Sequence, residues 1–183
     1  ILPRNKEKQI AFVKENWESN ILSEIDEKAL PLSSLLDELK NNAEAAIEKH
    51  GIKKEGSDAI LFMVKGQAGI KELDRSSSAG IMVLDVADLT GVSSCLVQIG
   101  PVIKKSVVRD SLSFIDFGDF DNQIEFANVS REINFFIRDN VISKLEGKLE
   151  PGTAVDFQGV FSYDGSGSVV ITPVMIQLVN GDQ

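Results

Sequence analysis

The feature that most restricts the fold of this chain is a long strand pattern that contains glycines. Residues 59–64 form a continuous apolar run of strand length, and Gly66 and Gly69 follow within the next five positions. Glycine inside a strand pattern is typical of a bend or a bulge. Because a small β-barrel closes only if its strands bend, we expect this segment to be the first strand of a barrel.

Four more segments have strand patterns: 81–86, 94–99, 154–163 and 169–179. The third of them alternates strictly, with Val155, Phe157 and Phe161 on its apolar side. The glycine-rich residues 164–168 predict a hairpin loop between the last two strands. Pro173 predicts an edge position or a bulge in the final strand.

Three segments have the periodicity of amphipathic helices: 5–26, 33–49 and 129–146. Gly51 ends the second, and Gly147 followed by Pro151 ends the third. The order is therefore two helices, three strands, an irregular crossover, a helix and two strands. This order predicts an α+β protein with an OB-fold, a five-stranded antiparallel barrel with a helix between its third and fourth strands. An open α+β sheet is the alternative.

The predicted boundaries divide the chain at residue 56. Residues 1–56 would be an N-terminal helical extension, and residues 57–183 would be the barrel domain. The chain has 183 residues and a net charge of -9. Its basic residues cluster only as Lys53-Lys54 and Lys104-Lys105, so we expect no nucleic-acid binding. No apolar run is long enough to span a bilayer.

The single cysteine, Cys95, cannot form an internal disulfide. It lies in an apolar strand pattern, and the only histidine that could activate it is His50. We therefore expect Cys95 to be a buried apolar side chain. The chain begins at Ile1 without a methionine or a signal peptide, and we expect that an upstream segment has been removed.

The crossover from Gly100 to Phe126 has neither a clean helical nor a clean strand pattern, and it contains the candidate site residues. Arg109 and Asp110 form its main polar pair, and Asn122-Gln123 is a second one. A guanidinium could bind a carboxylate or sugar hydroxyls in a pocket. Alternatively, these side chains could tie an irregular segment to the barrel by satisfying its backbone groups. For both polar pairs we favour this structural role over ligand binding.

The crossover also contains four phenylalanines: Phe114, Phe117, Phe120 and Phe126. The first interpretation is that they plug one end of the barrel. The second is that they form, with Trp17, an apolar platform that binds a ligand or a partner.

Acidic residues are frequent in the same segment. Asp116, Asp119 and Asp121 lack the spacing of a calcium loop, so we expect no metal site and no cofactor. A carbohydrate-active enzyme would need two carboxylates about 5–9.5 Å apart across a cleft. The candidate carboxylates for such a pair are Asp110, Asp116, Asp119 and Glu125.

Several short motifs occur in a characteristic order: 64–66, 78–80, 98–103, 109–112, 120–127, 157–161 and 171–174. Together they resemble a bacterial family of predicted periplasmic lipoproteins that is known only as a domain of unknown function. The resemblance implies export and a lipid anchor on an N-terminal cysteine, which this sequence does not contain. It also implies a genomic context of sugar ABC transporters. We therefore expect a trimmed mature chain, attached to the membrane only through an anchor outside these residues.

Three hypotheses for function remain open, and the last of them is a purely structural protein whose helices dock a partner. The first is a non-enzymatic binding or accessory module of the cell envelope, linked to carbohydrate ABC transport, whose partner is a small molecule such as a sugar or a transporter component. Its predicted binding residues are Arg109, Asp110, Phe117, Phe120, Asn122 and Gln123. The alternative is the carbohydrate-active enzyme with paired carboxylates. We expect no catalytic residues under the first hypothesis.

Overall fold

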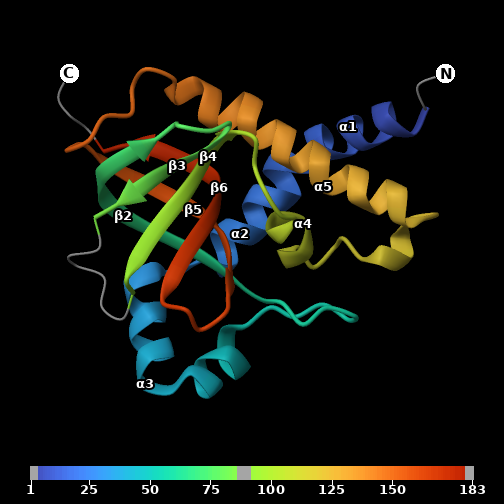
Figure 1. Cartoon of the computed structure of the whole chain (residues 1–183). Helices are drawn as coiled ribbons and strands as arrows, with labels where there is room; N and C mark the ends of the chain where they lie inside the picture. Colours follow the sequence, from blue (N-terminus) through green and yellow to red (C-terminus); the bar gives the residue numbers. More distant parts are fainter. Residues whose placement is uncertain (1–3, 86–91, 180–183) are drawn as a thin grey trace.

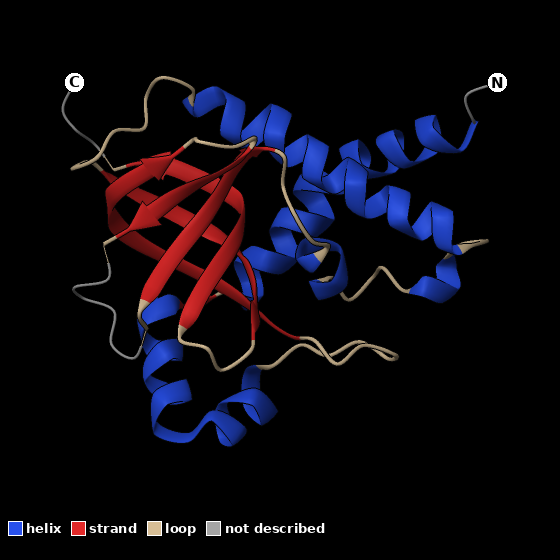
Figure 2. Ribbon diagram, in the orientation of Figure 1, coloured by secondary structure: helices blue, strands red, loops and turns tan. Residues whose placement is uncertain are grey.

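Five strands close into a barrel in the computed structural model, which describes residues 4–85 and 92–179 (Figures 1 and 2). The strands are β2 (Ile60–Asp74), β3 (Ala79–Leu84), β4 (Ser94–Pro101), β5 (Ala154–Tyr163) and β6 (Ser168–Leu178). Their order around the barrel is β2-β3-β4-β6-β5, and β5 pairs again with β2. Val86, the last residue of the second predicted strand, lies outside the described residues. The predicted OB-fold class is confirmed.

The long strand β2 closes the barrel by changing partners. Its residues 60–69 pair with β5, and its residues 70–74 pair with β3, with a register shift between Ile70 and Glu72. Gly66 faces the ring of Phe157, and a Cβ atom at this position would lie 2.9 Å from that ring. The expected irregularity of the strand near its glycines is therefore confirmed.

One pairing in the barrel is parallel. Strands β4 and β6 run in the same direction, while the other four pairings are antiparallel. The register between β5 and β6 shifts at Gly159, opposite Pro173. This shift confirms the bulge predicted at Pro173.

Helices surround the barrel on one side and at both ends. The N-terminal helix consists of α1 (Arg4–Asn16), a π-helical segment η1 (Trp17–Leu22) and α2 (Ser23–Lys28). The two-residue strand β1 (Leu30–Pro31) then precedes α3 (Leu32–His50). The crossover contains α4 (Val107–Ser111) and the short η2 (Phe117–Asp119). The last helical run is α5 (Gln123–Ile137), η3 (Arg138–Ile142) and η4 (Ser143–Leu145).

Two hydrophobic clusters hold these elements together. The first fills the barrel and is covered by leucines of α3 at one end and by Leu145 and Leu149 at the other. In Figure 1, α3 lies at the bottom of the barrel and the end of the α5 run lies across its top. The second cluster lies between the helices α1, α2, α4 and α5 and the outer face of the barrel.

The first half of β2 is buried on both faces because it belongs to both clusters. Phe62 and Val64 point into the barrel, whereas Leu61 and Met63 contact the helical layer. This double burial explains why residues 59–64 are continuously apolar instead of alternating. The predicted division of the chain at residue 56 stays a prediction. Helix α3 contributes its leucines to the barrel core.

Two sequence-based interpretations of the fold were wrong. The third helix begins at Gln123, not at Val129, because Asn122 caps its first turn. Phe114, Phe120 and Phe126 do not plug the barrel, since they pack against the second cluster on its outside.

Candidate functional site: a groove beside the crossover

A groove with a volume of about 810 Å³ borders the crossover segment and contains most of the predicted site residues. We call it the crossover groove. It is lined by residues 54–57, 109–110, 115–118, Gln123 and Phe126. The loop that carries residues 54–57 is closed at its base by a β-bridge between Ile52 and Leu61. In Figure 1 this teal loop extends below α4 and the start of α5.

The Arg109–Asp110 pair forms one wall of the groove. Arg109 Nε donates to Asp110 Oδ1 at 2.8 Å, and Arg109 Nη1 donates to the carbonyl oxygen of Phe126 at 3.0 Å. The guanidinium carbon also lies 3.6 Å from the centre of the Phe126 ring, a cation–π geometry. The side chains keep 11% and 31% of their surface exposed. The pair therefore ties α4 to α5 and still borders open space.

The predicted aromatic residues lie in two separate places: Phe117 and Phe120 pack on Phe126, whereas Trp17 packs elsewhere. Phe117 is 50% exposed, and its ring meets that of Phe126 edge to face at 5.5 Å between centroids. Phe120 packs on Phe126 from another direction at 5.5 Å and does not line the groove. Trp17 is buried and packs on Phe136 at 4.5 Å, in the seam between the N-terminal helix and α5. A platform that includes Trp17 is therefore wrong.

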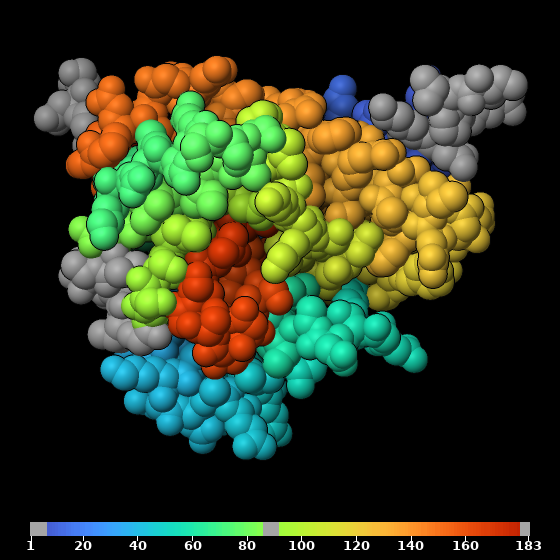
Figure 3. Space-filling model, in the orientation of Figure 1, coloured from blue at the N-terminus to red at the C-terminus, as the bar shows by residue number. Residues whose placement is uncertain are grey.

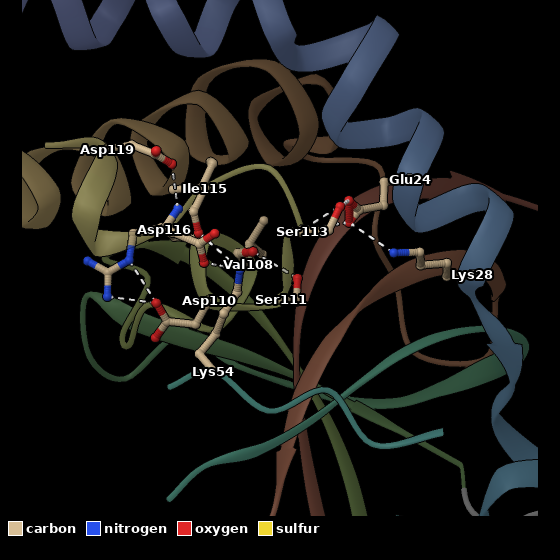
Figure 4. A network of polar contacts seen from close by, with 11 residues as sticks. Glu24, Lys28, Lys54, Val108, Asp110, Ser111, Ser113, Ile115, Asp116 and Asp119 are labelled. Atoms are coloured by element: carbon tan, nitrogen blue, oxygen red, sulfur yellow. Dashed lines mark hydrogen bonds and ion pairs between the residues drawn. The ribbon is translucent and has the colours of Figure 1, made fainter. Parts of the chain in front are cut away.

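The acidic residues of the crossover hold its backbone in place (Figure 4). Asp116 forms an ion pair with Lys54 at 2.9 Å, and Lys54 also donates to the carbonyl of Ile115 at 3.1 Å. Asp119 accepts a hydrogen bond from the backbone N–H of Asp116 at 3.0 Å. No group of three acidic, histidine or cysteine residues with metal-binding geometry occurs within residues 4–85 and 92–179.

Two further tethers fix the ends of this segment. Both carboxylate oxygens of Glu24, in α2, accept from the backbone N–H of Ser113 at 2.9 Å, and Lys28 pairs with the same carboxylate. Glu125 is buried and accepts from the N–H of Asp121 at 3.2 Å. Side-chain bonds, the first from a distant helix and the second from a residue four positions away, thus replace regular secondary structure here.

The Asn122-Gln123 pair divides between two roles. Asn122 Oδ1 accepts from the N–H of Glu125 at 3.0 Å, which is a helix N-cap, and Asn122 does not line the groove. Gln123 begins α5, is exposed and lines the groove. The structure therefore brings Arg109, Asp110, Phe117 and Gln123 together and leaves Phe120 and Asn122 outside the lining.

Comparison with known protein families assigns the chain to a family. The family described as predicted periplasmic lipoprotein (DUF2291) matches residues 4–177. The chain belongs to this family. Its description confirms the periplasmic, lipid-anchored localisation expected from the resemblance. No curated protein sequence matches the chain. None of the helices in the described ranges is long and apolar enough to cross a membrane.

One solved structure supports the fold of this DUF2291 protein. A crystal structure of an OB-fold protein from Thermotoga maritima is similar with a TM-score of 0.74 and 18% identity, over 93% of this chain and 98% of that chain. At that identity the likeness shows the fold alone. A structure of an OBody bound to hen egg-white lysozyme has a TM-score of 0.35 and 14% identity, over 75% of this chain and 89% of that chain. That second likeness is too low to support any argument.

Sequence reasoning missed the loop at residues 54–57 as part of the groove of this DUF2291 protein. Lys54 lies about sixty positions from the crossover in the chain, so no local pattern connects the two. The signal available in the sequence was a polar turn that contains Gly56. In the structure Gly56 has φ +79°, a left-handed conformation that favours glycine. Such a turn directly before a buried strand projects from the barrel and can cover a neighbouring surface.

The cysteine takes no part in the groove. Cys95 is buried inside the barrel, and this burial raises the pKa of its thiol to about 12. The thiolate form is therefore suppressed at neutral pH. The prediction of a buried apolar cysteine is confirmed.

Proposed function

We propose that this periplasmic lipoprotein is a non-enzymatic binding or accessory module of the cell envelope, and that the crossover groove binds a small polar ligand such as a sugar. The observation that carries the proposal is the Arg109–Asp110 pair next to the half-exposed ring of Phe117, in a groove of about 810 Å³. Pockets for small ligands commonly have volumes of about 300–1,000 Å³.

The chemistry of the groove fits a ligand that has both a ring face and hydroxyl groups. Phe117 offers an exposed aromatic surface on which an apolar sugar face can stack. Asp110 accepts hydrogen bonds, and Gln123 both donates and accepts them, so together they match hydroxyl groups. This ligand class agrees with the ABC-transport context that the resemblance implies.

The carboxylates of the groove favour binding over catalysis. Of the three carboxylates that line the groove, Asp110 is paired with Arg109 and Asp116 with Lys54, which leaves the exposed Glu55. A glycosidase needs one carboxyl group as a proton donor and a second as a base or nucleophile. Glu55 alone cannot fill both of these roles, and the two carboxylates that are paired with cations suit a structural role better than a catalytic one.

The test is a thermal-shift titration of the purified chain with monosaccharides, disaccharides, periplasmic metabolites and divalent cations. A ligand that binds only the folded state stabilises it by about 2.7 kcal/mol at one hundred times its Kd. We expect a saturable rise in Tm with a sugar. Phe117→Ala and Gln123→Ala should each reduce it strongly, because each removes a side chain that lines the groove.

Matched controls separate binding from stability. Phe120→Ala removes a ring that also packs on Phe126 but does not line the groove. Ile124→Ala is the control for Gln123→Ala. Ile124 is the next residue in the chain, is 72% exposed and does not line the groove. Both controls should keep the ligand shift. If both lining variants also kept it, or if no compound produced a shift, the groove would not be a sugar site. A transporter component captured from envelope extracts would then be the partner to test.

A further inference from the structure

A second cavity lies beside the crossover groove and has a different chemical character. It has a volume of about 400 Å³ and lies between residues 101–106 and one side of α5. In Figure 3 the yellow-green loop and the amber-to-orange helix lie side by side on this face. The cationic residues of its lining are Lys105, Arg109, Arg131 and Arg138, and no Asp or Glu is among the described residues that line it. We call it the basic cavity.

This concentration of positive charge is unusual for a chain with a net charge of -9. Two of the four cations are in ion pairs: Arg109 pairs with Asp110 at 2.8 Å and Arg138 with Asp139 at 2.7 Å. Arg131 donates a hydrogen bond to the neutral side chain of Asn128. Lys105 and Arg131 form no ion pair with any residue in 4–85 or 92–179. The pKa of the exposed Asp164 is lowered mainly by hydrogen bonds from Ser166, and the charge of Lys105 is the last of its causes. Two positive charges at the cavity therefore lack a carboxylate partner.

The backbone at Lys105 is held in an unfavourable conformation. Its φ is +70°, in the left-handed region that non-glycine residues rarely adopt. Asn134 Nδ2, from α5, donates to the carbonyl of Lys105 at 2.9 Å and lies 3.4 Å from that of Ile103. Gln98 is buried and binds Lys104 twice, accepting from its N–H at 2.8 Å and donating to its carbonyl at 3.1 Å.

These bonds attach residues 103–105 to β4 through Gln98 and to α5 through Asn134. A strained residue persists only where its surroundings determine its conformation, and such residues are frequent in ligand-binding sites. The loop thus places a lysine without an acidic partner at a cavity that Arg131 also lines. The ring of Phe135 and the hydroxyl-bearing Ser106 and Ser130 complete the surroundings of these charges.

We propose that the basic cavity binds a phosphate group. Guanidinium groups present forked donors that match the oxygens of a phosphate, and an ammonium adds a compact positive charge. The volume allows a small molecule that carries the phosphate, and not only the free ion. A soluble phosphorylated metabolite and the headgroup of an anionic lipid share this chemistry. The proposal does not depend on sugar binding in the crossover groove, since the two cavities share only Arg109.

The test measures binding of sn-glycerol 3-phosphate and of inorganic phosphate by isothermal titration calorimetry at about 0.15 M salt. In parallel, the chain is sedimented with phosphatidylglycerol-containing vesicles and with pure phosphatidylcholine vesicles. We expect Lys105→Gln and Arg131→Gln each to weaken binding about ten-fold, because each removes one charge-assisted hydrogen bond. Both residues are exposed, so both variants should fold.

Lys104→Gln is the matched control. It changes the net charge by the same amount at the adjacent exposed position, but Lys104 does not line the cavity. It should change the affinity by less than about two-fold, because its exposed side chain makes no contact in the cavity and its charge acts only through solvent. Binding of the soluble phosphates that is weakened in Lys105→Gln and Arg131→Gln but not in Lys104→Gln supports a metabolite site. Binding of the anionic vesicles alone, with the same pattern, supports a lipid headgroup. Absence of both, or an equal loss in Lys104→Gln, overturns the proposal.

Discussion

The barrel interior and the crossover segment of this protein are stabilised in different ways. The interior is closely packed: Phe62, Phe157 and Phe161 are at most 2% exposed, and a Cβ atom on Gly159 would lie 2.4 Å from a backbone oxygen. The crossover contains only short helical segments between Gly100 and Asn122. Its position depends on polar bonds from distant elements, such as those of Lys54 and Glu24.

This difference determines where a ligand can bind. Both ends of the barrel are covered, by α3 on one side and by Leu145 and Leu149 on the other. The crossover instead leaves Asp110 and Phe117 partly exposed and borders both proposed cavities. A rigid barrel thus supports a segment whose side chains can serve both structure and recognition. Mutations in the barrel interior should therefore lower the free energy of unfolding more than matched mutations in the crossover.

The largest effect is expected for Phe62→Ala. The ring is 0% exposed and lies 5.7 Å from that of Phe161, so its removal leaves a cavity in the barrel. We expect a loss of about 4 kcal/mol, measured by urea unfolding. Phe117→Ala, which truncates a ring that is 50% exposed, should cost less than about 1 kcal/mol. Equal losses would contradict the distinction between the two regions.

Gly159→Ala should have the next largest effect. The added Cβ would lie 2.4 Å from the carbonyl oxygen of Thr172, at the bulge between β5 and β6. Because backbone must move, we expect a loss of about 3 kcal/mol in urea unfolding. Gly118→Ala is the control in the crossover, where no atom lies within 4 Å of the added Cβ. A change beyond about 0.5 kcal/mol there would mean that the crossover is packed as tightly as the barrel.

The same difference explains how much of the fold the sequence could predict. Barrel strands carry recognisable patterns, so their number, their order and the irregularity of β2 just after Gly69 were predictable. The start of α5 at Gln123 was missed for a local reason. Its first turn has an exposed Ile124 and a buried Glu125, which is the reverse of the pattern used to find a buried helix face. The cap formed by Asn122 was the available signal.

The site was less predictable because its parts come from separate segments. Arg109, Asp110, Phe117 and Gln123 were expected together since they are near in sequence and chemically suited to binding. Lys54 was not, because only the folded chain brings residue 54 next to Asp116. The basic cavity was also missed, since Lys105 and Arg131 are ordinary surface residues until the loop and α5 pack together. Local patterns predict elements, whereas a site depends on contacts between them.

An intermediate effect is expected for Arg109→Ala, which tests how much one side chain stabilises the crossover. The substitution removes the hydrogen bond to the Phe126 carbonyl, the stacking on its ring and the partner of Asp110. We expect a loss of about 2 kcal/mol. Arg109→Lys keeps the charge but not the planar fork, so it should recover only part of this loss. Full recovery by lysine would show that charge alone, without the geometry, stabilises the segment.

The smallest effect is expected for Asn122→Ala, and it connects stability with the crossover groove. Loss of the N-cap bond to Glu125 should cost about 1 kcal/mol in urea unfolding. Asn122→Asp should restore this stability, because aspartate also caps and its charge is favourable at a helix N-terminus. Asn122 does not line the groove, whereas Gln123 and Phe126 in the first turn of α5 do. Fraying of that turn should therefore reduce the ligand-induced shift in Tm as well, and Asn122→Asp should restore both. A variant that lost stability but kept the full ligand shift would show that the groove does not depend on an ordered first turn.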